Sequence, residues 1–130
     1  MKYIELQDEL ISRYNIAICD GANCPGGRGR THSHAAGRRV CMWQRRNSVV
    51  STFTLLHEIG HIEMGESTMR RCELEYFATV WALRTAREYR LKIPEKLIAR
   101  YQSCIMLEYS REIRRGRRLP PPESFTLPRY

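Results

Sequence analysis

Apolar residues recur at intervals of three or four positions along most of this chain, a pattern that predicts helices with one buried face. The first predicted helix covers 3–14, where charged residues fill the opposite face, and Asn15 follows as a candidate end. Three further helices with the same periodicity are expected over about 51–64, 68–89 and 94–113.

Residues that favour helix ends support these boundaries. Ser51 or Thr52 could cap the second helix, because a hydroxyl oxygen accepts a hydrogen bond from the unpaired N–H groups of the first turn. Gly65 is well suited to end that helix. Pro94 fits the first turn of the last helix, where its missing N–H costs nothing.

Two short β-prone segments, 16–18 and 40–43, lie between the first and second predicted helices. The Gly-rich segment 21–39 between them is expected to be a loop, such as a long hairpin connection. We therefore predict a small, mostly helical α+β domain with a short β-hairpin or small sheet before the second helix. A single domain is expected over 1–119, and the Pro-rich tail 120–130 either packs along the surface or is disordered.

Composition narrows the class of protein. The chain has 130 residues, of which 42% are hydrophobic, and this fits one folded domain with a modest core. No apolar run is long enough to span a bilayer, and the first residues lack the apolar stretch of a secretory signal. We therefore expect a cytoplasmic protein without membrane contact. The five cysteines are an odd number, which favours thiols or metal ligands over a disulfide framework.

Positive charge is concentrated in two segments of this chain, whose net charge is +8. The stretch 28–46 holds six arginines and no acidic residue, and the run REIRRGRR covers 111–118. Such segments attract nucleic acid or acidic protein surfaces. The alternative is an ordinary solvated surface on a basic protein.

The second predicted helix carries the sequence HEIGH, with His57 and His61 four residues apart. Positions i and i+4 share one face of an α-helix, so two imidazoles at this spacing can bind one zinc ion. Glu58 points about 100° away and is the candidate general base for a zinc-bound water. The alternative is a buried helix with two incidental histidines, but burying these polar groups without partners is costly.

A catalytic zinc site needs a third protein ligand and one position for water. No histidine follows His61, so a carboxylate is expected to supply the third ligand. Glu63 and Glu66 are too close in sequence to turn back easily. The sequence leaves Glu73 and Glu75, which lie on opposite flanks of the apolar stripe of the next helix.

The segments FTLLHEIGHIEM and CELEYFATVWAL resemble the ImmA/IrrE-type metallopeptidases, HExxH zinc enzymes of the gluzincin type that phages and mobile elements often encode. The resemblance covers about 48–83. It rests on the Phe-Thr pair at 53–54, the motif at 57–61 and the Phe-Ala pair at 77–78. It implies a small zincin-like domain that cuts or regulates a specific protein, often a transcriptional repressor.

The same resemblance implies that Glu73 is the third zinc ligand, because it occupies the position of the family's glutamate. The chain departs from the family pattern at Leu74 and Glu75, where the family has Ala and Asn. These departures keep Glu75 as the alternative ligand.

A second group of potential metal ligands lies before the motif helix. A structural zinc could use Cys19, Cys24 and Cys41 with either His32 or His34. The spacing differs from the tight cysteine pairs of most structural zinc sites. The sequence therefore favours a Gly-rich loop with incidental thiols over a second ion.

The leading hypothesis is a cytoplasmic zinc-dependent endopeptidase that acts on a specific protein, such as a transcriptional repressor of a phage or mobile element. Its partner would be a protein substrate, including a DNA-binding regulator. The alternative is a zinc-containing, catalytically silent binding module that contacts a regulator or nucleic acid through its Arg-rich surface. Replacing Glu58 by Gln would abolish function in the first case and spare it in the second.

Overall fold

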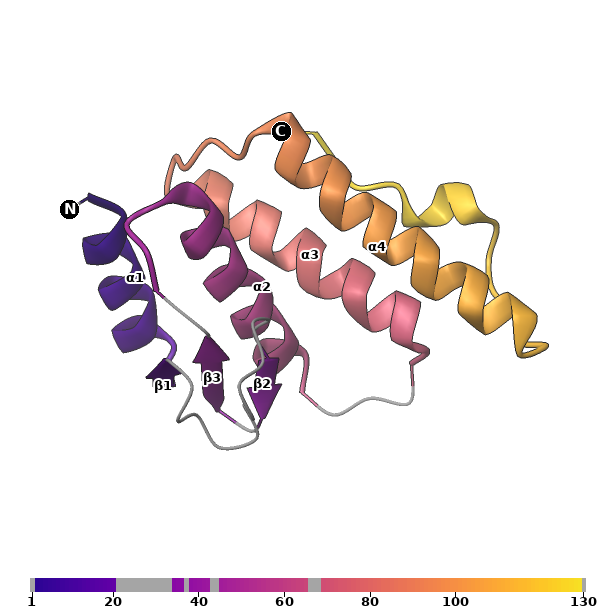
Figure 1. Cartoon of the computed structure of the whole chain (residues 1–130), viewed down its shortest axis with the longest axis horizontal. Helices are drawn as coiled ribbons and strands as arrows, with labels where there is room; N and C mark the ends of the chain where they lie inside the picture. The colour runs from indigo at the N-terminus through magenta and orange to yellow at the C-terminus, as the bar shows by residue number, and fades with distance from the viewer. Residues whose placement is uncertain (1, 21–33, 37, 43–44, 66–68, 130) are drawn as a thin grey trace. The chain divides into compact units, whose positions relative to one another are not determined.

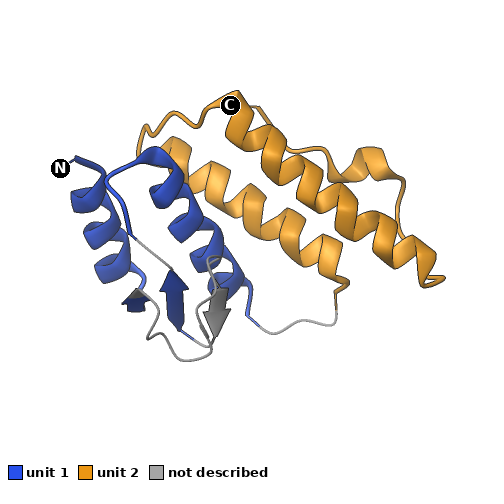
Figure 2. Ribbon diagram, in the orientation of Figure 1, with its two compact units in different colours: residues 1–65 blue, residues 66–130 orange. Residues whose placement is uncertain are grey.

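The computed structural model describes residues 2–20, 34–36, 38–42, 45–65 and 69–129. These residues are mostly helical with one small sheet, which confirms the predicted α+β class (Figure 1). The chain divides into two compact units, unit 1 over Met1–Gly65 and unit 2 over Glu66–Tyr130 (Figure 2). In chain order the elements are α1 (Lys2–Arg13), β1 (Ala17–Asp20), β2 (His34–Ala36), β3 (Arg39–Met42), α2 (Val49–Met64), α3 (Arg71–Glu88), α4 (Glu95–Arg114) and the 3₁₀-helix η1 (Pro122–Phe125).

The sheet of unit 1 has the strand order β1-β3-β2. β1 pairs with β3 in parallel, and β2 pairs with β3 in antiparallel orientation. The sequence suggested a hairpin connection between the first strand and the returning one, and this is wrong for β1 and β3. The antiparallel pair is formed instead by β2, a strand that the sequence analysis assigned to the loop.

The core of unit 1 forms where α2 packs against α1, β2 and β3. Leu10 of α1, Val40 of β3 and Phe53 of α2 are completely buried. Gln7 is a buried polar residue in this core, and its Nε2 donates to the carbonyl of Arg46 at 2.8 Å and to Thr52 Oγ1 at 3.0 Å. Since both partners precede or open α2, this side chain fixes the start of that helix against α1.

Helix α2 begins earlier than the sequence suggested. Ser48 is the N-cap, and its Oγ accepts a hydrogen bond from the backbone N–H of Ser51 at 3.1 Å. The predicted caps, Ser51 and Thr52, lie within the first turn, where Thr52 Oγ1 donates to the carbonyl of Ser48 at 2.8 Å. The helix ends as predicted at Gly65, whose φ of 69° favours glycine.

Unit 2 consists of α3 and α4, which pack against each other, and the C-terminal segment. Helix α3 begins at Arg71, later than the predicted 68, and α4 begins after Pro94, which is its N-cap. Residues 120–129 pack against α4. Of the two behaviours expected of the Pro-rich tail, packing along the surface is therefore the one observed. Gln102 of α4 donates to the carbonyl of Phe125 at 2.9 Å and accepts from the N–H of Leu127 at 2.7 Å.

Within the described ranges, the helices are too short or too polar to cross a membrane.

Candidate metal centre

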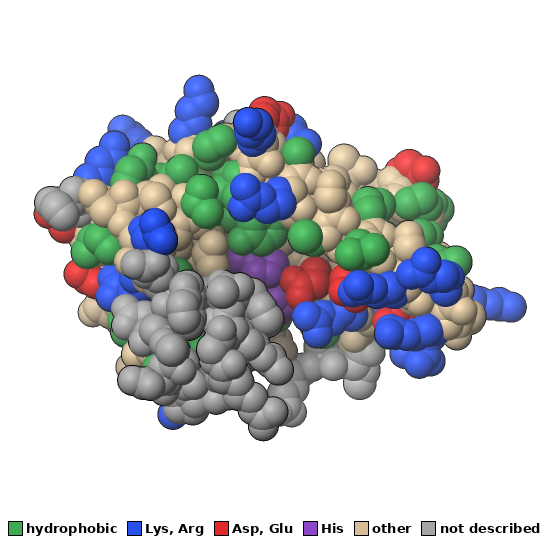
Figure 3. Space-filling view, in the orientation of Figure 1, with side chains coloured by type: hydrophobic (Ala, Val, Ile, Leu, Met, Phe, Trp, Pro, Cys, Tyr) green, Lys and Arg blue, Asp and Glu red, His purple; other side chains and the backbone are tan. Residues whose placement is uncertain are grey.

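Helix α2 holds His57 and His61 one turn apart on the same face, as the sequence predicted. Their Nε2 atoms are separated by 3.2 Å, and the two ring centroids by 4.8 Å with the rings almost perpendicular. His57 is 6% exposed, whereas His61 is only half-buried. Histidine side chains are visible on the face drawn in Figure 3.

The separation of the two nitrogens can be compared with the geometry of a zinc site. Two nitrogens bound to one tetrahedral zinc at ~2.0–2.1 Å lie ~3.3 Å from each other. The observed 3.2 Å between the Nε2 atoms is close to that edge of the tetrahedron. The imidazole pair of α2 therefore fits two positions of a zinc ion without rearrangement of the helix.

Glu58 follows the first histidine on α2 and is 9% exposed. Leu55, Leu56 and Ile59 of the same helix are buried as well. Burial places the carboxylate where water is scarce and where electrostatic interactions are stronger than in solution. A carboxylate in such a position can serve as a general base.

The two carboxylates that the sequence left as third ligands have different contacts within unit 2. Glu73 Oε1 accepts a hydrogen bond from the backbone N–H of Arg70 at 3.1 Å, as part of a capping box at the start of α3. Glu75 lies two residues further along, and its Oε1 is 3.4 Å from Nε of the exposed Arg71. Glu73 is thus already used to cap its own helix, while Glu75 has an ionic contact with the exposed Arg71. Glu66 lies outside the described residues.

The second predicted group of ligands is only partly described. Cys24 and His32 lie outside the described residues. Cys19 is on β1, Cys41 is on β3, and the backbone of His34 belongs to β2. The pairing of these strands was not foreseen from the sequence, and it brings the three positions into one row.

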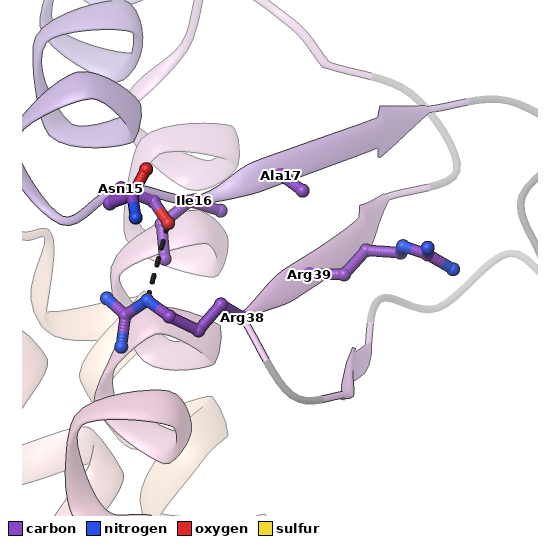
Figure 4. A pocket seen from close by; sticks show the side chains of 5 residues that line it. All are labelled: Asn15, Ile16, Ala17, Arg38 and Arg39. Atoms are coloured by element: carbon purple, nitrogen blue, oxygen red, sulfur yellow. Dashed lines mark hydrogen bonds between the residues drawn. The ribbon is translucent and has the colours of Figure 1, made fainter.

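Arginines of the 28–46 segment have structural roles that the charge pattern did not reveal. Arg38 donates from Nε to the carbonyl of Asn15 at 3.3 Å (Figure 4). Its Nη2 also donates to the carbonyl of Tyr14. It lies beside an open pocket of unit 1 lined also by Ile16, Ala17 and Arg39. Since its guanidinium already binds two carbonyls, we interpret Arg38 as a clamp between β3 and the turn after α1.

Arg45 makes a similar contact within unit 1. Its Nη2 is 2.7 Å from Asp8 Oδ1, and its Nε donates to Gln7 Oε1 at 3.3 Å. These bonds connect the segment before α2 to helix α1. Arg38 and Arg45 are therefore less available to an external anion than the sequence alone suggested.

The second basic run is also partly neutralised, within unit 2. Arg111 is 2.7 Å from Glu108, and Arg115 is 3.2 Å from Glu112. Arg117 approaches the same buried Glu112 at 3.7 Å. Figure 3 shows basic side chains interspersed with acidic ones on the face that it draws, rather than one uninterrupted basic patch.

Comparison of the chain with protein-family models, with curated proteins and with solved structures gave no match. The resemblance to the ImmA/IrrE-type metallopeptidases therefore rests on the quoted sequence segments alone and stays a prediction.

Proposed function

We propose that the protein is a zinc-dependent endopeptidase whose metal is held by His57 and His61. The observation that carries this proposal is the 3.2 Å separation of the two Nε2 atoms on one buried helix, next to a buried glutamate. A hydrogen bond between the two rings would also give this distance, and the metal content of the protein distinguishes the two explanations.

We assign the third ligand to Glu75 in this proposal. Its carboxylate can offer one ligand atom to a zinc ion, as can each imidazole of the α2 pair. The capping bond of Glu73 supports this choice over the residue that the family resemblance favours. Two imidazoles and one carboxylate are a common donor set of catalytic zinc, and they leave one position for water.

The reaction follows from the chemistry of these side chains. A bound zinc ion would polarise the scissile carbonyl and make a neighbouring water more acidic. The carboxylate of Glu58 accepts a proton from that water as its oxygen attacks the carbonyl carbon. Glu58 then donates the proton to the departing amide nitrogen, so that the peptide bond is replaced by a new carboxylate and a new amine.

The substrate in this proposal is a specific protein, and a DNA-bound regulator is the candidate that the family resemblance implies. The internal pairing of Arg38, Arg45 and Arg111 argues against a role in which arginines alone bind nucleic acid. The experiment below distinguishes the peptidase from the alternative function, a zinc-containing binding module.

The test compares cells that express the full chain as wild type, as Glu58→Gln or as Glu63→Gln. Glu63 lies on the same helix, is exposed, and has only a 3.9 Å contact with Arg38, so it is a matched control. New protein N-termini are then identified by mass spectrometry. We expect a small set of new termini with wild type and Glu63→Gln that is absent with Glu58→Gln.

An identical set of termini in wild type and Glu58→Gln, with both proteins folded and loaded with zinc, would exclude the peptidase and support the binding module. Loss of the termini in both glutamate variants would show that the effect is not specific to the general base, which also contradicts the proposal.

A further inference from the structure

The segment 120–129 of unit 2 lies on the two helices of that unit in the manner of a bound peptide. Figure 1 shows the segment, drawn in yellow, following α4, and its 3₁₀-helix η1 contacts that helix. Only two of its side chains, Phe125 and Leu127, are buried, and they are 3% and 2% exposed. A segment held by two buried side chains at alternate positions is typical of linear peptides bound to a protein surface.

Phe125 enters a pocket made by one aromatic residue from each helix. Its ring centroid is 5.5 Å from that of Tyr76 on α3, with the rings almost perpendicular, and 5.6 Å from that of Tyr109 on α4. Aromatic rings attract each other at such distances when they meet edge to face or tilted. The two helices therefore present a site that favours one aromatic side chain.

The hydrogen bonds of the segment to α4 use its main chain. Gln102 donates from Nε2 to the carbonyl of Phe125 at 2.9 Å and accepts from the N–H of Leu127 at 2.7 Å. The hydroxyl of Tyr109 donates to the carbonyl of Pro120 at 2.9 Å. Every peptide carries such carbonyl groups, and every residue except proline carries the N–H. The side chains of α4 can therefore bind other segments in the same way, and the two buried anchors decide which segments fit.

A charge at the start of α4 adds a third preference. Arg129 Nε is 2.8 Å from Glu95 Oε1, and Arg129 Nη1 donates to the carbonyl of Leu127 at 3.0 Å. Both side chains of the ion pair are substantially exposed, so the pair contributes little affinity but helps to set direction and register. The carboxylate of Glu95 thus favours a basic residue two positions after the aliphatic anchor.

We propose that the surface formed by Tyr76, Glu95, Gln102 and Tyr109 is a docking site for a linear segment of a partner protein. The partner segment carries an aromatic residue, an aliphatic residue two positions later and a basic residue two positions after that. Segment 120–129 occupies this site as an internal competitor, so the partner must displace it. The proposal does not depend on the metal or on peptide hydrolysis, because all of these contacts lie within unit 2.

The simpler explanation is that Phe125 and Leu127 are permanent parts of the core between α3 and α4. The residues 115–118, which connect α4 to the segment, are exposed, so release of the segment would uncover little beyond the two anchors. If the anchors belong to the core, their removal unfolds unit 2. If they occupy a docking site, the helices remain folded and the site becomes open to an added peptide.

The test uses the full chain with the double substitution Phe125→Ala/Leu127→Ala, which weakens the internal competitor and keeps the docking site. The probe is a fluorescein-labelled peptide of residues 118–129, and its binding is measured by fluorescence anisotropy. We expect the double variant to keep the helical circular dichroism of the wild type and to bind the peptide. Wild type should bind it at least ~10-fold more weakly, because the attached segment competes at a high effective concentration.

Two controls identify the site and the chemistry that it recognises. Adding Gln102→Ala to the double variant should lower the affinity by about 10-fold, because two hydrogen bonds are lost. Ser103→Ala, at the exposed neighbouring position of α4, should leave it unchanged. A second peptide keeps Phe125, Leu127 and Arg129 but has alanine at 121–124 and 126, and it should still bind.

Four results would overturn the proposal. The double variant could lose its helical signal, which would assign the anchors to the core, or it could stay folded without binding the first peptide. The second peptide could fail to bind, which would restrict the site to this chain's own segment. Light scattering could also show wild-type dimers that disappear in the double variant, which would make a second copy of the chain the occupant.

Discussion

The Nε2 atoms of His57 and His61 lie 3.2 Å apart on helix α2. This relationship is produced by a single element, because residues four apart on a helix face the same direction. The donor pair therefore exists as soon as α2 forms, and the Ser48 cap and the buried contacts of Phe53 stabilise that helix. A metal that binds this pair should also stabilise the folded state.

We expect His57→Ala to remove the zinc that binds the α2 pair. With one imidazole left, this helix can no longer chelate the ion with two nitrogens. The affinity for zinc should therefore fall by several orders of magnitude. Metal analysis after gel filtration measures the loss. A variant that keeps the wild-type metal content would exclude the α2 pair as a metal site.

Glu75 and Glu73 should respond differently to removal of their carboxylates. Glu75→Ala is expected to weaken zinc binding, measured by competition with a chromophoric chelator. Glu73→Ala should leave that affinity nearly unchanged but lower the free energy of unfolding by about 0.5–1 kcal/mol, because it removes the cap of α3. The opposite pattern, with zinc affinity lost only in Glu73→Ala, would restore the ligand that the family resemblance implies.

Gln7→Leu tests the polar connection between α1 and the start of α2. The substitution leaves the carbonyl of Arg46 and the hydroxyl of Thr52 without their bonds from Gln7, which is 0% exposed. We expect the free energy of unfolding to fall by about 2 kcal/mol, measured by urea denaturation. The control is Glu9→Ala on the exposed face of the same helix, which should change stability by less than about 0.5 kcal/mol. Equal effects of the two substitutions would contradict this role of Gln7.

Cys72 should make the stability of the protein depend on pH in the alkaline range. Burial raises the pKa of the Cys72 thiol above its ordinary 9.0, and the charges of Glu73 and Glu112 raise it further. The unfolded chain then loses this proton at lower pH than the folded chain, so stability declines as pH rises above about 9. Cys72→Ala should remove part of that decline between about pH 8 and 10, measured by urea denaturation. Cys104→Ala should not, and an unchanged slope in both variants would refute the assignment.

The helices and the chemistry on α2 could be predicted from the sequence. Hydrophobic periodicity is a local property, so α1, α2, α3 and α4 were each expected within a few residues of their observed bounds. The histidine spacing is equally local, since i and i+4 share a helix face in any fold. The starts of α2 and α3 differed from the predicted ones. For α2 the reason is that Ser48, Ser51 and Thr52 are all chemically suitable caps, and their choice depends on the contacts with Gln7 and Arg46.

The pairing of the strands was decided by the tertiary structure. Short strands carry little information about their partners, so neither the parallel pairing of β1 with β3 nor strand β2 could be read from the sequence. The roles of Arg38 and Arg45 were also decided by the tertiary structure, because their partners are 23 and 37 residues away in the chain. Sequence determined what forms along a helix, where neighbours are three or four residues apart. Tertiary structure decided what meets across the sheet, since Cys19 and Cys41 become neighbours only when their strands pair.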